Sequence, residues 1–429
     1  MISGARLLIA LALIPGALIL FGSLAVGEDK NEAIPLLSLA SKDQTNGVKK
    51  EVATILSQYK KGVTIDHDVA EMPAKQARQL VSTETVSDEK PVYADLKLFK
   101  ELTLKVKLSK RTRLGNRHFF TGKIHKESDS RVSFMIHKQV MMGKIHTQSG
   151  DLYSIRPLRR KGGLHLVQKL DRTKFPTCAV EAKAAKKKKS EKTKKTTANK
   201  KTVQVDILFL YNARAKTGAG GTTEDIEDEI LTALQDLNDL AEKSQIKPRF
   251  RCVGMREVKF NDMTSLAVLW EQLKGKTEGG IDHIHCLRDK VKADLVCLWV
   301  EEDEDGTKYG YADPIRELTP QMEEMGFSVV SRKWALAGYA FAHEIGHNFG
   351  CHHVKTSGLL GLKEYSFGHV FGPTSTEYRT LMGKGDQEMS LYYSSPCLKY
   401  KGIKTGVKDE AENARTINDS ADLVRDYRK

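Results

Sequence analysis

The chain has 429 residues, of which 40% are hydrophobic and 29% are charged. This composition excludes a disordered protein, and the length allows two or three domains with packed cores. The formal charge of +14 is unevenly spread: residues 1–201 carry 40 Lys and Arg against 19 Asp and Glu, whereas residues 202–429 carry 29 against 36. A basic first half and an acidic second half favour association with each other, although salt screens charges that lie far apart on exposed surfaces.

Residues 1–27 have the composition of a signal peptide. After a single Arg6, the run Leu7–Val26 is almost wholly apolar, and it ends in small residues suited to cleavage. The run is long enough for an uncleaved N-terminal anchor, but Pro15 and Gly16 interrupt it and favour the signal. We therefore predict a secreted protein, or a periplasmic one in a Gram-negative host. Nothing later in the sequence could span a membrane, so no stable membrane insertion is expected.

Short strand-like runs characterise residues 90–175, whereas residues 28–89 are polar and poorly periodic. Leu102–Leu108 alternates apolar and polar residues, as a strand with one buried face does. Similar short runs follow at Val132–Ile136, Met142–Thr147, Leu152–Leu158 and Gly163–Leu170. The pattern predicts a small antiparallel β domain.

Ten lysines crowd into residues 183–201. Such a run repels itself and forms no core, so it predicts an exposed, flexible linker. An exposed basic segment between two domains is easily cut by trypsin-like or dibasic-cleaving proteases, which makes it the expected processing site. Binding to an anionic surface and a merely solvated spacer are the alternatives. No aromatic residue is interleaved to stack on bases, so no nucleic-acid partner is expected.

Residues 202–429 alternate strand-like and helix-like segments, which predicts a mixed α/β domain. The expected strands are Val203–Tyr211, Arg249–Phe260 and Asp294–Val300, and the expected helices are Thr223–Gln245, Ser265–Lys274 and Ile281–Val291. Tyr309–Asp313 is either an edge strand or a surface loop.

The segment His343–His353 matches H-E-x-x-H-x-x-G-x-x-H. The apolar run Trp334–Ala342 before it predicts a mostly buried helix that continues into the motif. On that helix His343 and His347 share one face, where two neutral imidazoles can bind one zinc ion. Glu344 projects beside them and is the candidate base that takes a proton from water.

Gly350 explains how a third ligand reaches the same ion. A glycine at this place can adopt the left-handed conformation that ends a helix and turns the chain, which brings His353 to the metal. Three histidines leave one position of a tetrahedral zinc open, and an open position separates catalytic from structural zinc. The sequence therefore predicts one catalytic Zn²⁺.

With a methionine 29 residues after the motif, in Thr380–Gly383, the sequence resembles the metzincin peptidases, in which a methionine turn lies beneath the metal. Met382 would be that methionine. Residues from Val203 onward look most like the reprolysin or adamalysin group and its bacterial peptidyl-Asp relatives, on the runs Asp294–Val300, Ser328–Arg332, Tyr393–Pro396 and Asn413–Asn418. One departure is Val354, where adamalysins usually carry Asp.

The resemblance implies an α+β or mixed α/β catalytic domain at residues 202–429, with a twisted, mostly parallel sheet, an antiparallel edge strand and a zinc helix. That edge strand would pair with an extended protein or peptide substrate. The resemblance also implies that residues 28–182, with the small antiparallel β prodomain, are a propeptide that inhibits the enzyme until an activating protease removes it.

Cys178, just before the linker, is the candidate inhibitory zinc ligand in such a precursor, because a thiolate can fill the open position. Related latent enzymes usually have Gly after this cysteine, whereas this chain has Ala179. An ordinary thiol and a disulfide partner for one of the five later cysteines are the alternatives. Among those five, Cys297 is expected to be a buried thiol, and Cys351 and Cys397 are a candidate disulfide pair.

Together these features predict a secreted zinc endopeptidase made as a latent precursor, with Glu344 as general base and then general acid. A secreted, non-catalytic zinc-binding module of the same fold is the alternative, although Glu344 has no function in it. A surface-binding protein that acts through its lysine tract is a third possibility.

Overall fold

The computed structural model describes residues 32–158, 162–179, 201–260, 263–275, 283–356 and 361–429. The predicted signal peptide at 1–27 and almost all of the lysine-rich linker at 183–201 lie outside these residues. Within them, no helix combines the length and the apolar character needed to cross a bilayer.

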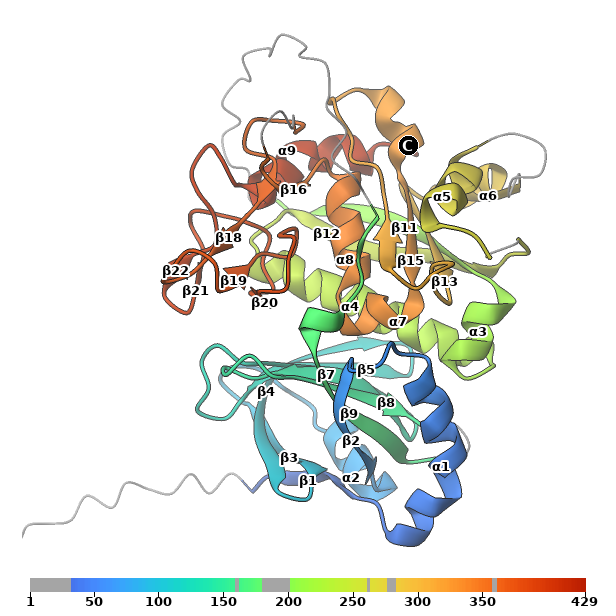
Figure 1. The fold of residues 1–429 in the computed structure, drawn as a ribbon, viewed down its shortest axis with the longest axis vertical. Helices are drawn as coiled ribbons and strands as arrows, with labels where there is room; N and C mark the ends of the chain where they lie inside the picture. The colour runs from blue at the N-terminus through green and yellow to red at the C-terminus, as the bar shows by residue number, and fades with distance from the viewer. Residues whose placement is uncertain (1–31, 159–161, 180–200, 261–262, 276–282, 357–360) are drawn as a thin grey trace, which may run out of the picture. The chain divides into compact units, whose positions relative to one another are not determined.

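Nine strands close into a barrel in the order β1-β2-β9-β8-β7-β6-β5-β4-β3 (Figure 1). The strands are β1 (Ile34–Leu39), β2 (Thr64–Glu71), β3 (Val92–Phe99), β4 (Leu102–Leu114), β5 (Arg117–Ile124), β6 (Arg131–His137), β7 (Val140–His146), β8 (Leu152–Pro157) and β9 (Leu164–Leu170). The neighbours β1 and β3 are parallel, and the other neighbouring strands are antiparallel. Buried apolar side chains such as Leu96, Phe120 and Ile155 pack together as the core of this barrel.

The barrel extends beyond the predicted β domain at residues 90–175, because β1 and β2 are needed to close it. β2 pairs with β9 from Thr64 opposite Leu170 to Glu71 opposite Leu164. Most of β2 before Val69 is exposed or half-buried, so its sequence carries little apolar alternation. Two helices, α1 (Lys42–Ser57) and α2 (Ala74–Val81), also lie within residues 28–89, whose sequence is polar and poorly periodic.

The second half is built on a six-stranded sheet in the order β10-β14-β15-β13-β11-β12. The strands are β10 (Thr177–Cys178), β11 (Val203–Tyr211), β12 (Pro248–Glu257), β13 (Leu295–Val300), β14 (Lys308–Tyr311) and β15 (Phe327–Ser331). β12, β11, β13 and β15 run parallel, and β14 is antiparallel to β15. The segment Tyr309–Asp313, predicted as either an edge strand or a surface loop, therefore contains part of a strand, β14. This strand is not at the edge of the sheet, because β10 pairs with the side of β14 that faces away from β15.

Helices cover both faces of this sheet. α4 (Thr223–Lys243), α8 (Ala340–Asn348) and α9 (Asn413–Arg425) pack with Ile207, Phe209 and Trp299 in one core. α5 (Leu266–Lys274) and α6 (His283–Val291) pack with Leu208, Leu210 and Leu298 in the other. Alternate residues of β11 thus face opposite layers, as the period of two in a strand requires. Two short helices, α3 (Ala213–Ala219) and α7 (Arg332–Ala337), and three small sheets complete this half.

The zinc-motif helix is shorter than predicted. The run Trp334–Ala342 does not form one helix, because α7 ends at Ala337 and α8 starts after Tyr339, whose φ is 55°. Tyr339 is 2% exposed, and the Lys144 ammonium of the barrel lies 3.6 Å from the centre of the Tyr339 ring. A contact with a distant strand therefore stabilises a left-handed conformation that local propensity disfavours.

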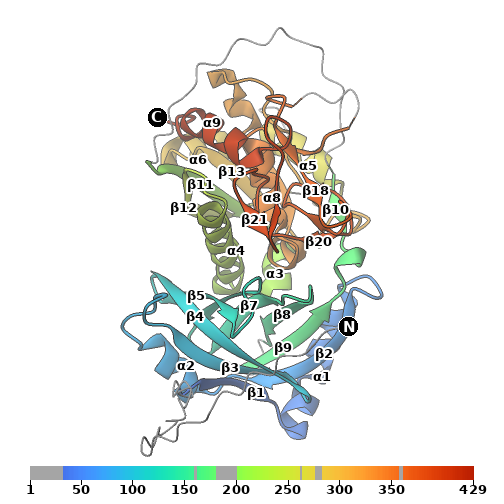
Figure 2. The ribbon, with the colours of Figure 1, turned by 90° about the vertical axis from the view of Figure 1, so that its left-hand side faces the viewer.

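Residues 33–429 form one compact unit, in which strands β5, β6 and β7 contact α4 (Figure 2). His146 of β7 is 6% exposed, and its ring lies 5.6 Å from that of Tyr339, which precedes α8. Neither ring nitrogen of His146 has a hydrogen-bond partner among the described residues. Burial, reinforced by Arg172, Lys144, Arg131 and Lys243, lowers the pKa of His146 well below its usual range.

This environment predicts acid-dependent stability. Because the pKa of His146 is lower in the folded than in the unfolded chain, its stabilising contribution is complete above the ordinary imidazole pKa of about 6.5 and is lost as the pH falls below it. We expect His146→Phe to flatten the fall in the free energy of unfolding between about pH 6.5 and 4. Urea unfolding at a series of pH values measures this, with His67→Phe, an exposed position in β2, as the control. A pH dependence equal to that of the parent protein would contradict the prediction.

Candidate metal centre

Helix α8 carries the first three residues of the site. His343, Glu344 and His347 are each at most 2% exposed. Beneath the helix, a Cβ atom placed on Gly346 would lie 2.5 Å from Met382 Sδ. The methionine therefore approaches the helix as closely as it does because residue 346 has no side chain.

The end of α8 brings the third histidine to the other two. Gly350 has φ +87°, its N–H donates to His347 O at 2.8 Å, and Cys351 N–H donates to Gly346 O at 3.0 Å. These two bonds are the Schellman arrangement, which reverses the chain direction after a helix. His353 then follows in the short strand β16 (His352–Val354), which pairs with β17 (Phe367–Gly368).

The three imidazoles meet through their Nε2 atoms. His353 Nε2 lies 3.0 Å from His343 Nε2 and 3.2 Å from His347 Nε2. His343 Nδ1 lies 2.9 Å from Leu381 O, and His347 Nδ1 lies 2.7 Å from Cys351 O. A carbonyl accepts only from a protonated nitrogen, so these two rings carry their proton on Nδ1 and present the Nε2 lone pair to the shared point.

Burial lowers the pKa of all three histidines well below the usual range, which holds them in the neutral form that binds metals. Neutral rings with lone pairs facing one another repel unless a cation lies between them. The donor set, three imidazole nitrogens in a buried site, is one that suits zinc. The residues present therefore fit the ion that the sequence predicts.

Glu344 lies beside this cluster and is shielded from solvent. Its side chain is fully buried, its Oε1 has no hydrogen-bond partner among the described residues, and burial raises its pKa well above the usual range. A Cβ atom on Gly310 of β14 would lie 2.4 Å from Glu344 Oε1. Gly310 is thus a site residue that sequence reasoning missed. Its signal was a glycine inside the candidate edge strand, which often marks close approach of another group.

The segment around Met382 fixes the orientation of His343. Leu381 supplies the carbonyl that fixes His343, and Met382 is completely buried. The Tyr393 hydroxyl donates to Ala342 O at 2.6 Å, which ties the later segment to the start of α8. In the sequence, Tyr393 is only part of a run that resembles the reprolysin group, and nothing there predicts this contact.

Cys178 comes into the same cluster from the strand β10. Its Sγ lies 3.6 Å from His347 Nε2 and 3.8 Å from Glu344 Oε2. The ligand atoms of Cys178 and the three histidines all lie within 4.8 Å of one another. Backbone bonds flank the thiol: Thr177 N–H donates to Thr307 O at 3.1 Å, and Ala179 N–H donates to Gly310 O at 2.9 Å.

The other cysteines do not take part in this cluster. Cys297 is a buried thiol, as expected, and burial raises its pKa to about 12. The suggested disulfide between Cys351 and Cys397 is wrong, because both are free. Cys351 is buried with its thiol 3.6 Å from Asn413 O, whereas Cys397 is exposed.

Comparison with known proteins agrees with this geometry. Residues 201–394 match the family model described as Metallo-peptidase family M12. The chain is 22% identical over 291 residues to a peptidyl-Asp metalloendopeptidase of Stenotrophomonas maltophilia strain K279a, with 66% of this chain and 67% of the relative covered. A peptidyl-Asp metalloendopeptidase of Xanthomonas campestris pv. campestris is 22% identical over 287 residues, with 64% and 65% covered.

Among solved structures, metalloproteinase-II from Bacteroides fragilis superimposes with a TM-score of 0.40 and 15% identity, over 66% of this chain and 87% of that one. The residues matched by the family model, 201–394, span the zinc motif, the glycine that turns the chain and the methionine segment. The chain is therefore a metzincin-like zinc metalloendopeptidase, and its residues 201–394 are similar to metallopeptidase family M12.

Proposed function

We propose that this protein is a secreted endopeptidase made as a latent precursor, in which His343, His347 and His353 hold the zinc ion and Glu344 moves the protons. The observation that carries this proposal is the convergence of three Nε2 atoms beside a carboxylate oxygen of Glu344. His353 Nε2 lies 3.0 and 3.2 Å from the other two, and the Glu344 oxygen has no hydrogen-bond partner in the described part of the chain. Secretion rests on the composition of residues 1–27 alone.

Glu344 would act first as a base. Its Oε1 is available to accept a proton from the attacking water, and the raised pKa that burial gives this carboxyl makes it a stronger proton acceptor. The carboxyl would then give the proton to the leaving amine nitrogen. A zinc ion held by the three histidines would supply Lewis-acid chemistry, which polarises the scissile carbonyl and lowers the pKa of water.

Strand β14 would align the substrate. It runs antiparallel to β15, and Gly310 places its backbone directly against Glu344. An extended peptide can bind such an edge through backbone hydrogen bonds. In the present structure β10 forms those bonds, and Cys178 places its thiol among the imidazoles. This is the arrangement expected of a precursor whose own segment excludes substrate.

Arg379 is the candidate group for choosing the peptide bond. It lies in β19 (Tyr378–Arg379), its Nη1 donates to Gly383 O at 3.1 Å, and its buried Nε has no partner among the described residues. The charge of Arg379 is among the smaller causes, after burial, that lower the pKa of His343 and His353, and Arg379 lies three residues before Met382 in the sequence. Because the relatives are named for peptidyl-Asp bonds, we propose that Arg379 binds an aspartate side chain of the substrate.

The metal assignment predicts the zinc content of two neighbouring histidine variants. His347→Gln should lose the bound zinc that the parent protein retains after dialysis, because it removes one of three ligands. His352→Gln, which alters a buried ring that lies 5.8 Å from the Phe367 ring and outside the ligand set, should retain it. Elemental analysis of the purified proteins measures both, and equal zinc in the two variants would refute the assignment.

The proton-transfer assignment predicts the effect of Glu344→Gln. Loss of a general base should lower kcat of the proteolytically activated protein by about 10²-fold to 10⁴-fold, while zinc content and folding are retained. Gly310→Ala should also lower kcat, because the new methyl group displaces the Glu344 carboxylate. Peptide turnover and circular dichroism measure these effects. A fully active Glu344→Gln protein would rule the mechanism out.

The specificity assignment predicts the behaviour of Arg379→Gln on paired peptides that differ only in Asp or Asn beside the cleaved bond. The ratio of kcat/KM for Asp over Asn should fall by about 10-fold to 100-fold, the range of one hydrogen-bonded charge contact. Arg415→Gln, whose parent guanidinium pairs with Asp409 and Glu412, should leave the ratio unchanged. An unchanged ratio in Arg379→Gln would assign the preference elsewhere.

A further inference from the structure

We propose that the acidic side of helix α4 is a docking surface that keeps the barrel bound as a separate chain after the linker at 183–201 has been cut, so that linker cleavage alone does not activate the enzyme. The proposal rests on the latent precursor proposed above. In this proposal the contact of the barrel with α4, rather than the Cys178 thiol, keeps the inhibitory strand in place.

Carboxylates line the side of α4 that meets the barrel. Asp228, Asp236 and Asp239 recur at helical spacing and are each at most 5% exposed. The opposite side of the helix carries the apolar residues that pack on the sheet, including Ile230, Leu234 and Leu237. α4 therefore has two buried sides, and the acidic one is buried only because the barrel covers it.

Each of these carboxylates meets a cation from a different barrel strand. Asp236 Oδ2 lies 2.9 Å from Lys144 Nζ, and Asp239 Oδ2 lies 3.2 Å from Arg131 Nη2. Asp228 Oδ1 lies 2.6 Å from Arg117 Nε. Further pairs at the same contact join Lys110 to Asp239 and Arg156 to Glu229. Buried pairs of this kind are much less weakened by salt than exposed ones.

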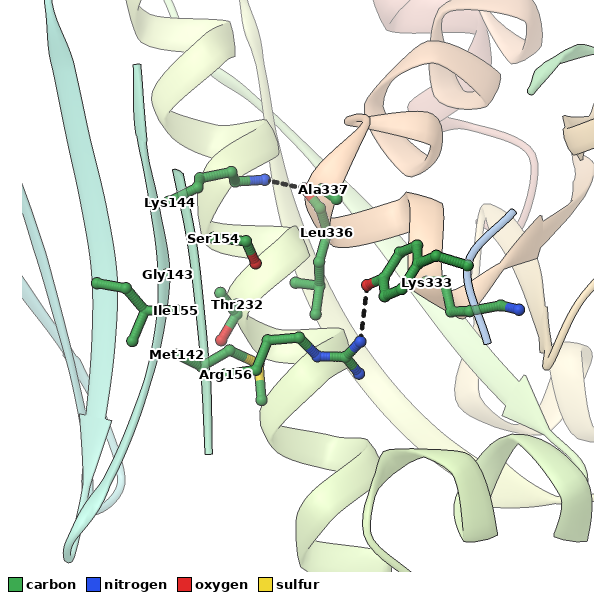
Figure 3. A pocket seen from close by; sticks show the side chains of 11 residues that line it. Met142, Gly143, Lys144, Ser154, Ile155, Arg156, Thr232, Lys333, Leu336 and Ala337 are labelled. Carbon is green, nitrogen blue, oxygen red and sulfur yellow. Dashed lines mark hydrogen bonds between the residues drawn. The ribbon is translucent and has the colours of Figure 1, made fainter. Parts of the chain in front are cut away.

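Apolar packing accompanies the charges. Phe119, Met135 and Met142 point out of the barrel and belong to the same hydrophobic core as α4. One cavity between the two parts has a volume of about 20 Å³, room for about one water (Figure 3). The Lys144 ammonium and the Leu336 carbonyl, drawn with a hydrogen bond in Figure 3, close one side of it. A second cavity, of about 280 Å³, lies where Lys110 and Thr112 of β4 face Gln235, Asn238 and Glu242 of α4. Apolar packing around Phe119, Met135 and Met142 thus accompanies the ion pairs of this contact.

By contrast, the inhibitory strand makes few contacts of its own. β10 has two residues, and its pairing with β14 is flanked by two backbone hydrogen bonds. Only three residues separate Cys178 from Lys174, the end of the 3-10 helix Arg172–Lys174 that follows the barrel. A barrel docked on α4 therefore holds Cys178 at a high effective concentration beside the histidines, whether or not the chain is intact at residues 183–201.

The experiment introduces a specific protease site into residues 183–201 of the full chain, cuts the folded zinc-bound protein, and follows the two pieces by size-exclusion chromatography at 0.15 and 0.5 M NaCl. We expect the pieces to co-elute at both salt concentrations without peptidase activity. Cys178→Ala should co-elute as well. Asp239→Lys should weaken association on the order of 100-fold, so that the pieces separate at micromolar concentration.

Arg131→Glu changes the other partner of the Asp239 pair and supplies a second test if Asp239→Lys does not fold. Glu271→Lys, which alters an exposed residue of α5 paired only with Lys274 in the same helix, is the matched control and should co-elute. Separation of the cut parent protein at 0.15 M NaCl, or of the cut Cys178→Ala protein, would overturn the docking proposal. Full activity in a co-eluting complex would overturn the latency on which it rests. Absence of activity after digestion of the barrel would instead contradict the proposed catalysis and leave the association result standing.

Discussion

The site depends on the burial of three neutral imidazoles around one point. Two of the rings are fixed by backbone carbonyls that accept from Nδ1, so their Nε2 lone pairs cannot turn away from one another. The two acceptors, Leu381 O and Cys351 O, come from different segments: one precedes Met382, and the other follows the Schellman turn of Gly350. A buried polar cluster is stable only when its members are satisfied, and a cation at the shared point would satisfy this one.

Close approach of backbone explains the rest of the active-site architecture. Gly346 admits Met382 beneath the helix, and Gly310 admits the edge strand beside Glu344. The carboxylate therefore lies between a ligand-bearing helix and a strand that can bind a peptide. Because Cys178 reaches the imidazoles along that same strand, its segment and an extended peptide would compete for one edge of the sheet.

The barrel contacts the peptidase half through α4, which buries apolar residues on one side and carboxylates on the other. The apolar side fits an amphipathic helix packed on a sheet and was visible in the sequence. The acidic side has the pattern of an ordinary solvated helix face, yet Asp228, Asp236 and Asp239 are buried against barrel cations. No local property distinguishes a carboxylate that faces water from one that faces a distant arginine. The overall charges of the two halves were the only sequence signal of this contact.

The sequence by itself determined the zinc motif, the helix that carries it, the turn at Gly350 and three strands of the central sheet, β11, β12 and β13. These features depend on residue type and short-range spacing, which a sequence displays directly. Only the tertiary structure decided the closure of the barrel through β1 and β2, the break at Tyr339, the approach of Gly310 to Glu344 and the arrival of Cys178 among the histidines. Each of these results from a contact between segments far apart in the chain, where packing and buried charge outweigh local preference.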